Sequence, residues 1–297
     1  MSRCVVIIGA NGQLGQDLRR YWEANCQQDK VVPLTHADIE VADSGSVAAV
    51  LGRLKPQLVI NTSAYHKVDL VEEDPERAFA VNSVGVRTLA LACRDVDAVL
   101  THMSSDYVFS GRDRRPYTEG DPVEPINVYG ASKAAGEMLL RYLWPKHFIV
   151  RSSGLYGVAG SSGKGGNFVE LMLQLATQGK PIRVVDDQVL TPTGTWPLAK
   201  QLAALSTTQD YGTYHATCQG ECSWYEFAAE IFKLSGLAPE LTPQSTADSG
   251  ARALRPAYSV LENRGLKRLG ADLMPGWRES LADYLEQRAV RAEGRSA

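Results

Sequence analysis

The first fifteen residues constrain the fold of this chain more than any other stretch. Residues 4–8 (CVVII) are apolar and rich in β-branched side chains, which predicts a strand buried on both faces. The segment GANGQLG at residues 9–15 follows at once, and residues 16–24 have a helical pattern. A glycine-rich turn between a first strand and a helix brings backbone N–H groups close to a dinucleotide pyrophosphate. We therefore predict dinucleotide binding here, although the spacing is Gly-x-x-Gly-x-x-Gly instead of Gly-x-Gly-x-x-Gly.

Strands and helices alternate in the next part of the chain. The patterns predict strands at residues 30–34, 57–61, 98–102 and 148–151, and helices at residues 43–54, 75–94 and 129–143. Asn82 falls inside the second of these helices, where we expect a solvated polar side chain. This order predicts a parallel sheet with helices on both faces, in which ligands bind beyond the carboxyl ends of the strands.

The alternation loosens after Arg151, and a flexible loop rich in glycine and serine is expected at residues 157–166. Beyond it the patterns predict a strand at residues 182–185 and helices at residues 167–177, 198–205, 225–234 and 277–292. We predict an α/β protein with a Rossmann-type doubly wound parallel sheet over residues 1–150. Residues 151–297 are expected to form a smaller C-terminal α/β domain, mainly substrate-binding, with some segments returning to the Rossmann sheet.

Charge and composition exclude several classes of protein. The net charge is −3 over 297 residues, so no basic surface argues for nucleic acid. The longest apolar runs are strand-length, far below a membrane span, and no room for a signal peptide precedes residues 4–8. Only Cys218 and Cys222 lie close together among five cysteines, without a second pair to complete a metal site. We expect a cytoplasmic protein with reduced thiols, no metal and no membrane association.

The pentapeptide YGASK places Tyr129 and Lys133 four residues apart. On a helix this spacing puts both side chains on one face, one turn apart. A phenol has a pKa of about 10, and a nearby ammonium favours its ionised form. The pair therefore suits proton transfer to a carbonyl oxygen or from an alcohol. Alone the pattern is weak, because ordinary helix surfaces contain it by chance.

Several short motifs occur in a specific order and spacing, and together they cover nearly the whole chain. They are GANGQLG at residues 9–15, NTSAY at 61–65 with Val68-Asp69, SSDYVF at 104–109, YGASK at 129–133 with Gly136-Glu137, Asp187-Gln188 with Pro192-Thr193, and Arg255-Pro256 with Ser259 and Leu261. In this combination the chain resembles the extended short-chain dehydrogenase/reductase family, and most closely its sugar-nucleotide reductases.

The resemblance implies an NADPH- or NADH-dependent reduction of the 4-keto group of a nucleotide-linked 6-deoxy sugar. The implied substrate is dTDP-4-dehydro-L-rhamnose, and the implied product is dTDP-L-rhamnose. The implied catalytic residues are Ser105, Tyr129 and Lys133. Tyr129 would protonate the oxygen, while Lys133 would lower the tyrosine pKa and hold the nicotinamide ribose. Ser105 stands where the subfamily usually has threonine, and either hydroxyl can bond the carbonyl oxygen.

Contacts to the two ligands follow from the same motifs. The cofactor is expected to contact Gly9, Asn11, Gly12, Gln13, Leu14, Gly15, Asp38, Ile39, Ala64, Tyr65, Tyr129 and Lys133. The substrate is expected to contact Val68, Ser105, Tyr107, Tyr129, Asn167 and Arg255. At the end of the second strand, Thr35-His36-Ala37 includes neither the acid of the NAD-specific pattern nor an arginine, so the residues leave NADPH and NADH open. Because the chain is slightly acidic, the diphosphate needs local cations, and the candidates are Lys164, Arg252 and Arg255.

Three departures from the subfamily pattern bear on the substrate and the assembly. Gly154 replaces a tryptophan that packs on the sugar, which leaves the sugar identity open. Leu190 replaces a glycine. Acids associated with a magnesium-bridged dimer are not evident at Gln16 or at Thr195-Trp196. We expect no metal, and a homodimer stays open.

Two alternatives to the reductase remain. Sugar-nucleotide dehydratases place an Asp-Glu pair after the serine or threonine, whereas this chain has Asp106-Tyr107, which argues against dehydration but not against epimerisation. A non-catalytic NADP-binding regulatory subunit, like that of methionine adenosyltransferase, is the alternative from another class. The intact Ser105, Tyr129 and Lys133 favour an enzyme.

Overall fold

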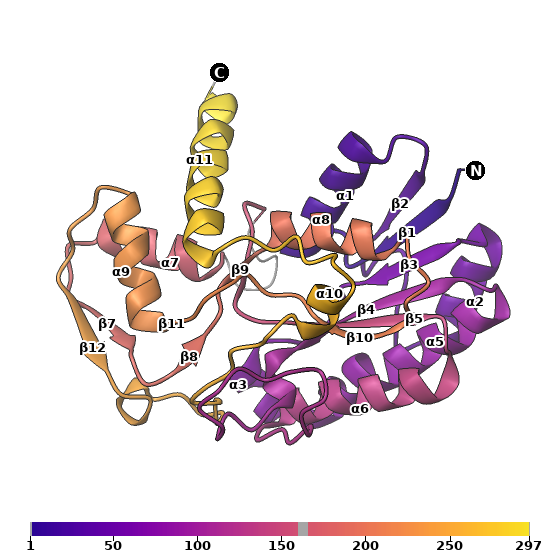
Figure 1. The fold of residues 1–297 in the computed structure, drawn as a ribbon, viewed down its shortest axis with the longest axis horizontal. Helices are drawn as coiled ribbons and strands as arrows, with labels where there is room; N and C mark the ends of the chain where they lie inside the picture. The colour runs from indigo at the N-terminus through magenta and orange to yellow at the C-terminus, as the bar shows by residue number, and fades with distance from the viewer. Residues whose placement is uncertain (1, 160–165, 297) are drawn as a thin grey trace.

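A six-stranded parallel sheet forms the centre of the computed structural model, which describes residues 2–159 and 166–296 (Figure 1). Its order is β10-β5-β4-β3-β1-β2, and every neighbouring pair is parallel. The strands are β1 (Cys4–Ile8), β2 (Lys30–Leu34), β3 (Leu58–Asn61), β4 (Val99–Ser105), β5 (His147–Ser152) and β10 (Gly212–His215). The predicted α/β fold with a doubly wound parallel sheet is confirmed.

Helices cover both faces of this sheet. One face carries α1 (Gln13–Asn25) and α8 (Thr195–Leu205), and the other carries α2 (Ser44–Leu54), α5 (Gly85–Asp95) and α6 (Val128–Leu143). The first strand shows why both faces are apolar. Val5 and Ile7 join the core with α1 and α8, whereas Val6 and Ile8 join the core with α2 and α5. Alternate side chains of a strand point to opposite faces, so a continuous apolar run is buried on both.

The helix predicted at residues 75–94 is interrupted in the structure. It consists of α4 (Pro75–Phe79), a π-helical turn η1 (Ala80–Val84) and α5, and α3 (Val68–Glu73) precedes it. The expectation that Asn82 is solvated is wrong, because this residue is only 1% exposed. Its amide bonds the backbone N–H and carbonyl of Tyr65 and donates to Ser132 Oγ at 3.0 Å. Asn82 therefore joins the loop after β3 to α6, and π-turns of this kind are frequent at functional sites.

The second half of the chain forms the left part of Figure 1 and also contributes β10 and α8 to the central layers. Its other strands and α-helices are β6 (Leu155–Tyr156), α7 (Phe168–Ala176), β7 (Ile182–Val185), β8 (Val189–Leu190), β9 (Thr193–Gly194), β11 (Cys222–Ser223), α9 (Trp224–Leu234), β12 (Leu241–Gln244), α10 (Arg264–Arg268) and α11 (Trp277–Ser296). Six of these strands form two-stranded sheets, β6 with β9, β7 with β12, and β8 with β11. Within residues 2–159 and 166–296, no helix is both long and apolar enough to cross a membrane.

Candidate active site

The glycine turn packs the start of α1 tightly against the end of β1. Gly9 has φ of +80°, and a Cβ atom there would lie 2.7 Å from Thr62 Oγ1. A Cβ atom at Gly15 would lie 2.3 Å from the Gly9 carbonyl oxygen. Helix α1 begins at Gln13, three residues earlier than predicted, and in the described structure no side chain caps its N-terminus. Backbone N–H groups of the first turn are thus available to an anion, which fits the pyrophosphate of a dinucleotide.

Gly12 offers a test of this cradle, because its backbone conformation (φ −78°, ψ 171°) suits any residue. We expect Gly12→Val to leave a folded protein whose NADPH affinity falls below the measurable range, since the added side chain blocks approach of the pyrophosphate. Calorimetric titration with NADPH measures the loss. Gly52→Val on α2 is the matched control, because its Cβ has no described neighbour within 4 Å. Unchanged affinity in a folded Gly12→Val protein would contradict the assignment.

The other cofactor candidates lie beside this turn, at the carboxyl ends of β1, β2 and β3. The backbone N–H groups of Gly9 and Ala10 both donate to the Leu34 carbonyl at the end of β2. Just beyond it, the Asp38 carboxylate accepts from the Thr35 N–H and hydroxyl at 2.8 and 2.7 Å, which lowers the pKa of Asp38. The remaining candidates in this region are Asn11, Gln13, Leu14, Ile39, Ala64 and Tyr65.

The three predicted catalytic residues come from α6 and from the end of β4. Tyr129 and Lys133 lie on α6, and Ser105 is the last residue of β4. The Tyr129 side chain hydrogen-bonds that of Ser105. A Cβ atom at Gly130 would lie 2.0 Å from the Tyr107 carbonyl oxygen, so only glycine lets α6 approach the 3-10 turn Asp106–Val108 after β4 this closely. The structure thus brings the predicted tyrosine and serine together.

Burial determines the pKa of Tyr129 and so its protonation state. Burial raises the pKa of Tyr129 to about 12. The predicted lowering of this pKa by Lys133 is not seen. The Lys133 Nζ instead donates to the Met103 carbonyl at 2.6 Å and lies 3.2 Å from His102 Nε2. Tyr129 is therefore a phenol at neutral pH, which is the form that can donate a proton.

Asp106 is a buried carboxylate that holds Ser105. Its oxygens accept the hydroxyls of Ser105, Ser153 and Ser259 at 2.9, 2.8 and 2.7 Å. Burial raises the pKa of Asp106, and the three hydrogen bonds oppose that rise. The hydroxyl of Ser105 donates to Asp106, and its oxygen accepts from the Tyr107 backbone N–H at 3.2 Å. A hydroxyl oxygen has two lone pairs, so one is left to accept from Tyr129. Sequence patterns do not reveal this cluster, because Asp106 and Ser259 lie 153 residues apart.

The predicted substrate residues fall into two groups. Asp69 Oδ2 accepts from Arg255 at 2.7 Å, and Arg255 also bonds the hydroxyl of Tyr107. The Tyr107 ring lies edge-on to Tyr129 with centroids 5.8 Å apart, so Arg255 and Tyr107 border the predicted catalytic tyrosine. Val68 begins the helix that carries Asp69.

Asn167, by contrast, lies on the other side of the glycine turn. Its side-chain amide donates to Gln13 Oε1 at 3.1 Å and to the Gly157 carbonyl at 3.0 Å. Among the cation candidates, Arg252 pairs with Glu73, while Lys164 and most of the predicted loop at residues 157–166 lie outside the described residues.

Two departures from the subfamily pattern meet in space. Gly154 has φ of +55°, and a Cβ atom there would lie 2.8 Å from Leu190 Cδ1. Leu190 is 4% exposed and occupies the space beside residue 154. A large side chain at position 154 therefore needs a small residue at position 190, and the two departures are coupled by packing.

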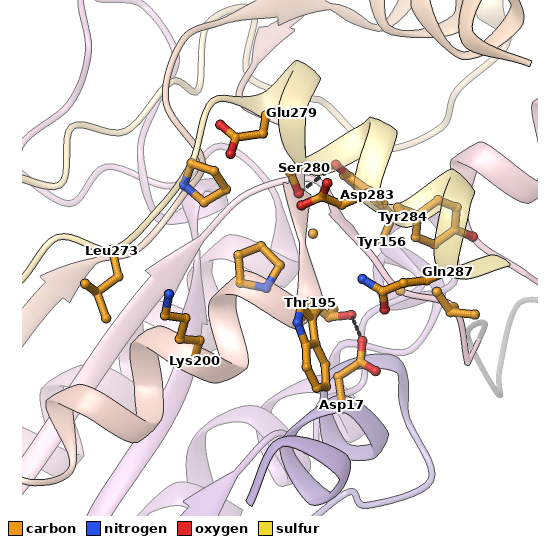
Figure 2. Close-up of a pocket in the computed structure, with 16 residues that line it drawn as sticks. Asp17, Tyr156, Thr195, Lys200, Leu273, Glu279, Ser280, Asp283, Tyr284 and Gln287 are labelled. Carbon is orange, nitrogen blue, oxygen red and sulfur yellow. Dashed lines mark hydrogen bonds between the residues drawn. The ribbon is translucent and has the colours of Figure 1, made fainter. Parts of the chain in front are cut away.

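A separate cavity of about 250 Å³ lies between α1, α8 and α11, and the predicted catalytic residues do not line it (Figure 2). Asp17 lies at its edge, accepts from the Thr195 hydroxyl and pairs with Arg20 at 2.9 Å. Glu279 and Asp283 also line the cavity. Within the described part of the chain, no three histidine, cysteine or carboxylate side chains come together as a metal site.

Comparisons with known proteins give a consistent picture. Residues 2–290 match the family described as the RmlD substrate binding domain. The chain is 39% identical over 286 residues to the Bacillus subtilis spore coat polysaccharide biosynthesis protein SpsK, covering 96% of this chain and 98% of that protein. It is 38% identical to the dTDP-4-dehydrorhamnose reductase of Streptomyces griseus, covering 97% and 94% of the two chains.

A solved structure agrees with these relatives. The dTDP-4-dehydrorhamnose reductase of Bacillus anthracis, in complex with NADP, superposes with a TM-score of 0.92 at 38% identity and covers 97% of this chain and 100% of its own. A dTDP-glucose 4,6-dehydratase and a UDP-glucose 4-epimerase, at 19% and 20% identity, share the fold alone.

Proposed function

Since the chain belongs to the family described as the RmlD substrate binding domain, we propose that it is an NAD(P)H-dependent oxidoreductase that reduces the 4-keto group of a dTDP-linked 6-deoxy sugar. The proposed substrate is dTDP-4-dehydro-L-rhamnose, after the relatives named for that reaction. The observation that carries the proposal is the hydrogen-bonded pair of Ser105 and Tyr129 beside the buried Lys133, on the same sheet edge as the glycine cradle. Ligands of parallel α/β sheets bind at this edge.

Each of the predicted site residues has a distinct role in the proposed reduction. The nicotinamide supplies the hydride to the keto carbon when it is bound. Tyr129, kept as a phenol by burial, donates a proton to the oxygen, and Ser105 accepts the hydrogen bond that orients it. Asp106 fixes the Ser105 hydroxyl, so the orientation of the pair is set before substrate arrives. Gly9, Gly12 and Gly15 would hold the pyrophosphate, and Lys133 the nicotinamide ribose.

Turnover tests the proposal directly. We expect the purified protein to oxidise NADPH in the presence of dTDP-4-dehydro-L-rhamnose, followed by absorbance, and to do so faster than with other 4-keto sugar nucleotides. NADH in parallel settles the cofactor preference. A protein that binds NADPH but turns over none of these sugars would reject the enzyme and favour the regulatory-subunit alternative.

The surroundings of Asp106 argue against dehydration. In the dehydratase resemblance the acids after the serine drive water elimination, but Asp106 is 4% exposed and already accepts three serine hydroxyls. Tyr107 occupies the place of the second acid. Epimerisation is distinguished by its products, because an epimerase that oxidises an alcohol and reduces the ketone again releases the epimeric alcohol without net consumption of NADPH.

The substrate domain is proposed to comprise most of residues 151–297, with β10 and α8 in the Rossmann layers. A cytoplasmic location is also proposed from the sequence alone. So is a homodimer, which sedimentation of the purified protein tests.

Arg255 is the proposed contact to the diphosphate. An arginine can hold phosphate by a bidentate charge-assisted pair that lysine cannot copy. We expect Arg255→Lys to raise the KM for the nucleotide sugar with less effect on the KM for NADPH. Arg255 also pairs with Asp69, whose other oxygen accepts from the backbone N–H groups of Arg252 and Ala253, so the residue can instead brace this segment. A lower melting temperature with an unaltered sugar KM would reject the phosphate role, and Asp69→Asn is the control for the brace.

A further inference from the structure

Lys133 is enclosed in the interior, and its amine has few partners. The side chain is 1% exposed, and Nζ donates to the Met103 carbonyl at 2.6 Å. The other polar atom at hydrogen-bonding distance is His102 Nε2, at 3.2 Å. His102 lies on β4 and is fully buried. Which of these two nitrogens carries the shared hydrogen depends on the tautomer of the histidine.

Asn61 fixes that tautomer. Its Oδ1 accepts from the Ser63 backbone N–H at 3.1 Å and from the Ser63 hydroxyl at 2.6 Å. A backbone N–H can only donate, so the amide oxygen must face Ser63 and the NH₂ group must face His102. Asn61 Nδ2 lies 3.1 Å from His102 Nδ1, and Nδ1 therefore has to accept. The hydrogen of the neutral ring is left on Nε2, directed at Lys133.

We propose that His102 is a positioning residue for the proton chemistry of Lys133, because Asn61 fixes its tautomer and the resulting Nε2–H favours the neutral amine over the ammonium. An ammonium has only N–H donors, so it would face the His102 N–H without an acceptor. A neutral amine has a lone pair that accepts from this N–H, and it still donates to the Met103 carbonyl. The inference rests on the proposed function only in that it assigns Lys133 to the catalytic site.

The charged surroundings agree with this arrangement. Burial lowers the pKa of Lys133 to about 8, and Glu137, one turn further along α6, opposes the shift. Glu137 is itself paired with Arg151 on β5 and Arg141 on α6. Burial, together with the charge of Lys133, holds the pKa of His102 well below its usual range. The histidine is thus neutral, and the lysine is close to the point at which it releases a proton.

A role in the reduction follows. When Tyr129 has given its proton to the substrate oxygen, the phenolate must regain one. Lys133, one helical turn away, can supply it as ammonium and become a neutral amine, which the His102 N–H stabilises. Solvent then returns a proton to the amine, so one solvent proton is consumed for each carbonyl reduced.

The test is a titration of Lys133 itself. Carbon-13 NMR of protein labelled at lysine Cε follows each lysine with pH, and Lys133→Met identifies the signal by its loss. In the double variant Asn61→Leu, His102→Gln the amide can turn its oxygen toward the ammonium, because no Asn61 NH₂ group is left to orient it. In Asn61→Leu the histidine is retained, but its tautomer is released. We expect both variants to raise the Lys133 pKa by about one unit or more, the typical size for a hydrogen bond to a charged group.

Controls separate this effect from a structural one. His147 is a buried histidine and the first residue of β5. The matched variant His147→Gln should leave the Lys133 pKa unchanged. The alkaline limb of the pH profile of kcat/KM should move up with the Lys133 pKa, whereas a structural defect lowers activity without moving the limb. If the double variant Asn61→Leu, His102→Gln does not fold, Asn61→Leu carries the test. An unchanged Lys133 pKa in the folded variants overturns the proposal, and because the titration needs no turnover, it does so independently of the proposed function.

Discussion

Tyr129→Phe is expected to lower kcat by about 10²–10⁴-fold, the usual value of general acid catalysis, while NADPH still binds. The substitution keeps the ring and its edge-on contact with Tyr107 and removes only the hydroxyl. The loss falls on kcat because the proton is donated in the transition state and not on binding. Rates of NADPH oxidation at saturating keto sugar, together with the NADPH dissociation constant, measure the two effects separately.

The same helix supplies a matched control for this variant. Tyr142 also lies on α6 but is 86% exposed, and Tyr142→Phe should leave kcat unchanged. If Tyr129→Phe keeps activity within a few-fold of the parent, another group donates the proton. Tyr107 is then the next candidate, because its hydroxyl lies beside the same site and bonds Arg255.

Local patterns predicted the parts of the fold that depend on neighbouring residues. The apolar run at residues 4–8 predicted a buried strand, because burial on both faces requires consecutive apolar residues. The glycines after it predicted a close turn, because a positive φ favours glycine. The spacing of Tyr129 and Lys133 predicted a shared helix face. The fold class and the family were confirmed by the structure and by the relatives.

Features that depend on contacts between distant segments could not be predicted in this way. The role of Asn82 depends on Tyr65 and Ser132, which lie 17 and 50 residues away. The tautomer of His102 is set by Asn61, 41 residues earlier. No periodicity or spacing in the sequence predicts such pairs, since a polar residue alone can equally well be exposed to solvent or hydrogen-bonded to a buried partner. The missed residues therefore gather where strands and helices meet.

The balance between burial and charge was also outside the reach of the sequence. A lysine four residues after a tyrosine suggested a lowered tyrosine pKa, because Coulomb attraction was the only interaction that the spacing revealed. In the fold both groups are desolvated, and the lysine amine is directed to β4. The cost of desolvating the phenolate outweighs the attraction of the lysine charge, so the proposed acid Tyr129 remains protonated.

Glu137→Gln is expected to reduce the free energy of unfolding by about 3–5 kcal/mol, which is typical when one partner of a buried ion pair is removed. Glu137 is fully buried and accepts from Arg151 at 2.9 and 2.6 Å and from Arg141 at 2.6 Å. Arg151 is 1% exposed, so the neutral amide leaves its charge without compensation in the interior. Urea denaturation of the parent and the variant measures the difference.

Two controls show whether the buried charge is the cause. Glu23→Gln removes the exposed pair with Arg19 and should change stability little. The double variant Glu137→Leu, Arg151→Met removes both charges and should be more stable than Glu137→Gln, because no unpaired charge is left. A loss no larger than that of Glu23→Gln would show that the cluster does not stabilise the fold.

The dependence of this loss on pH gives a further check. Burial acts to raise the pKa of Glu137, but the hydrogen bonds and charge of Arg151 outweigh it, so the pKa in the fold is lowered from its usual value of 4.5. A carboxyl whose pKa is lowered by folding contributes stability above the unfolded pKa and loses it as the pH falls through the folded pKa. The difference between the parent and Glu137→Gln should therefore be full at neutral pH and shrink progressively below about pH 4.5. A difference that stays constant into acid would place the effect in packing or hydrogen-bond geometry and not in the carboxylate charge.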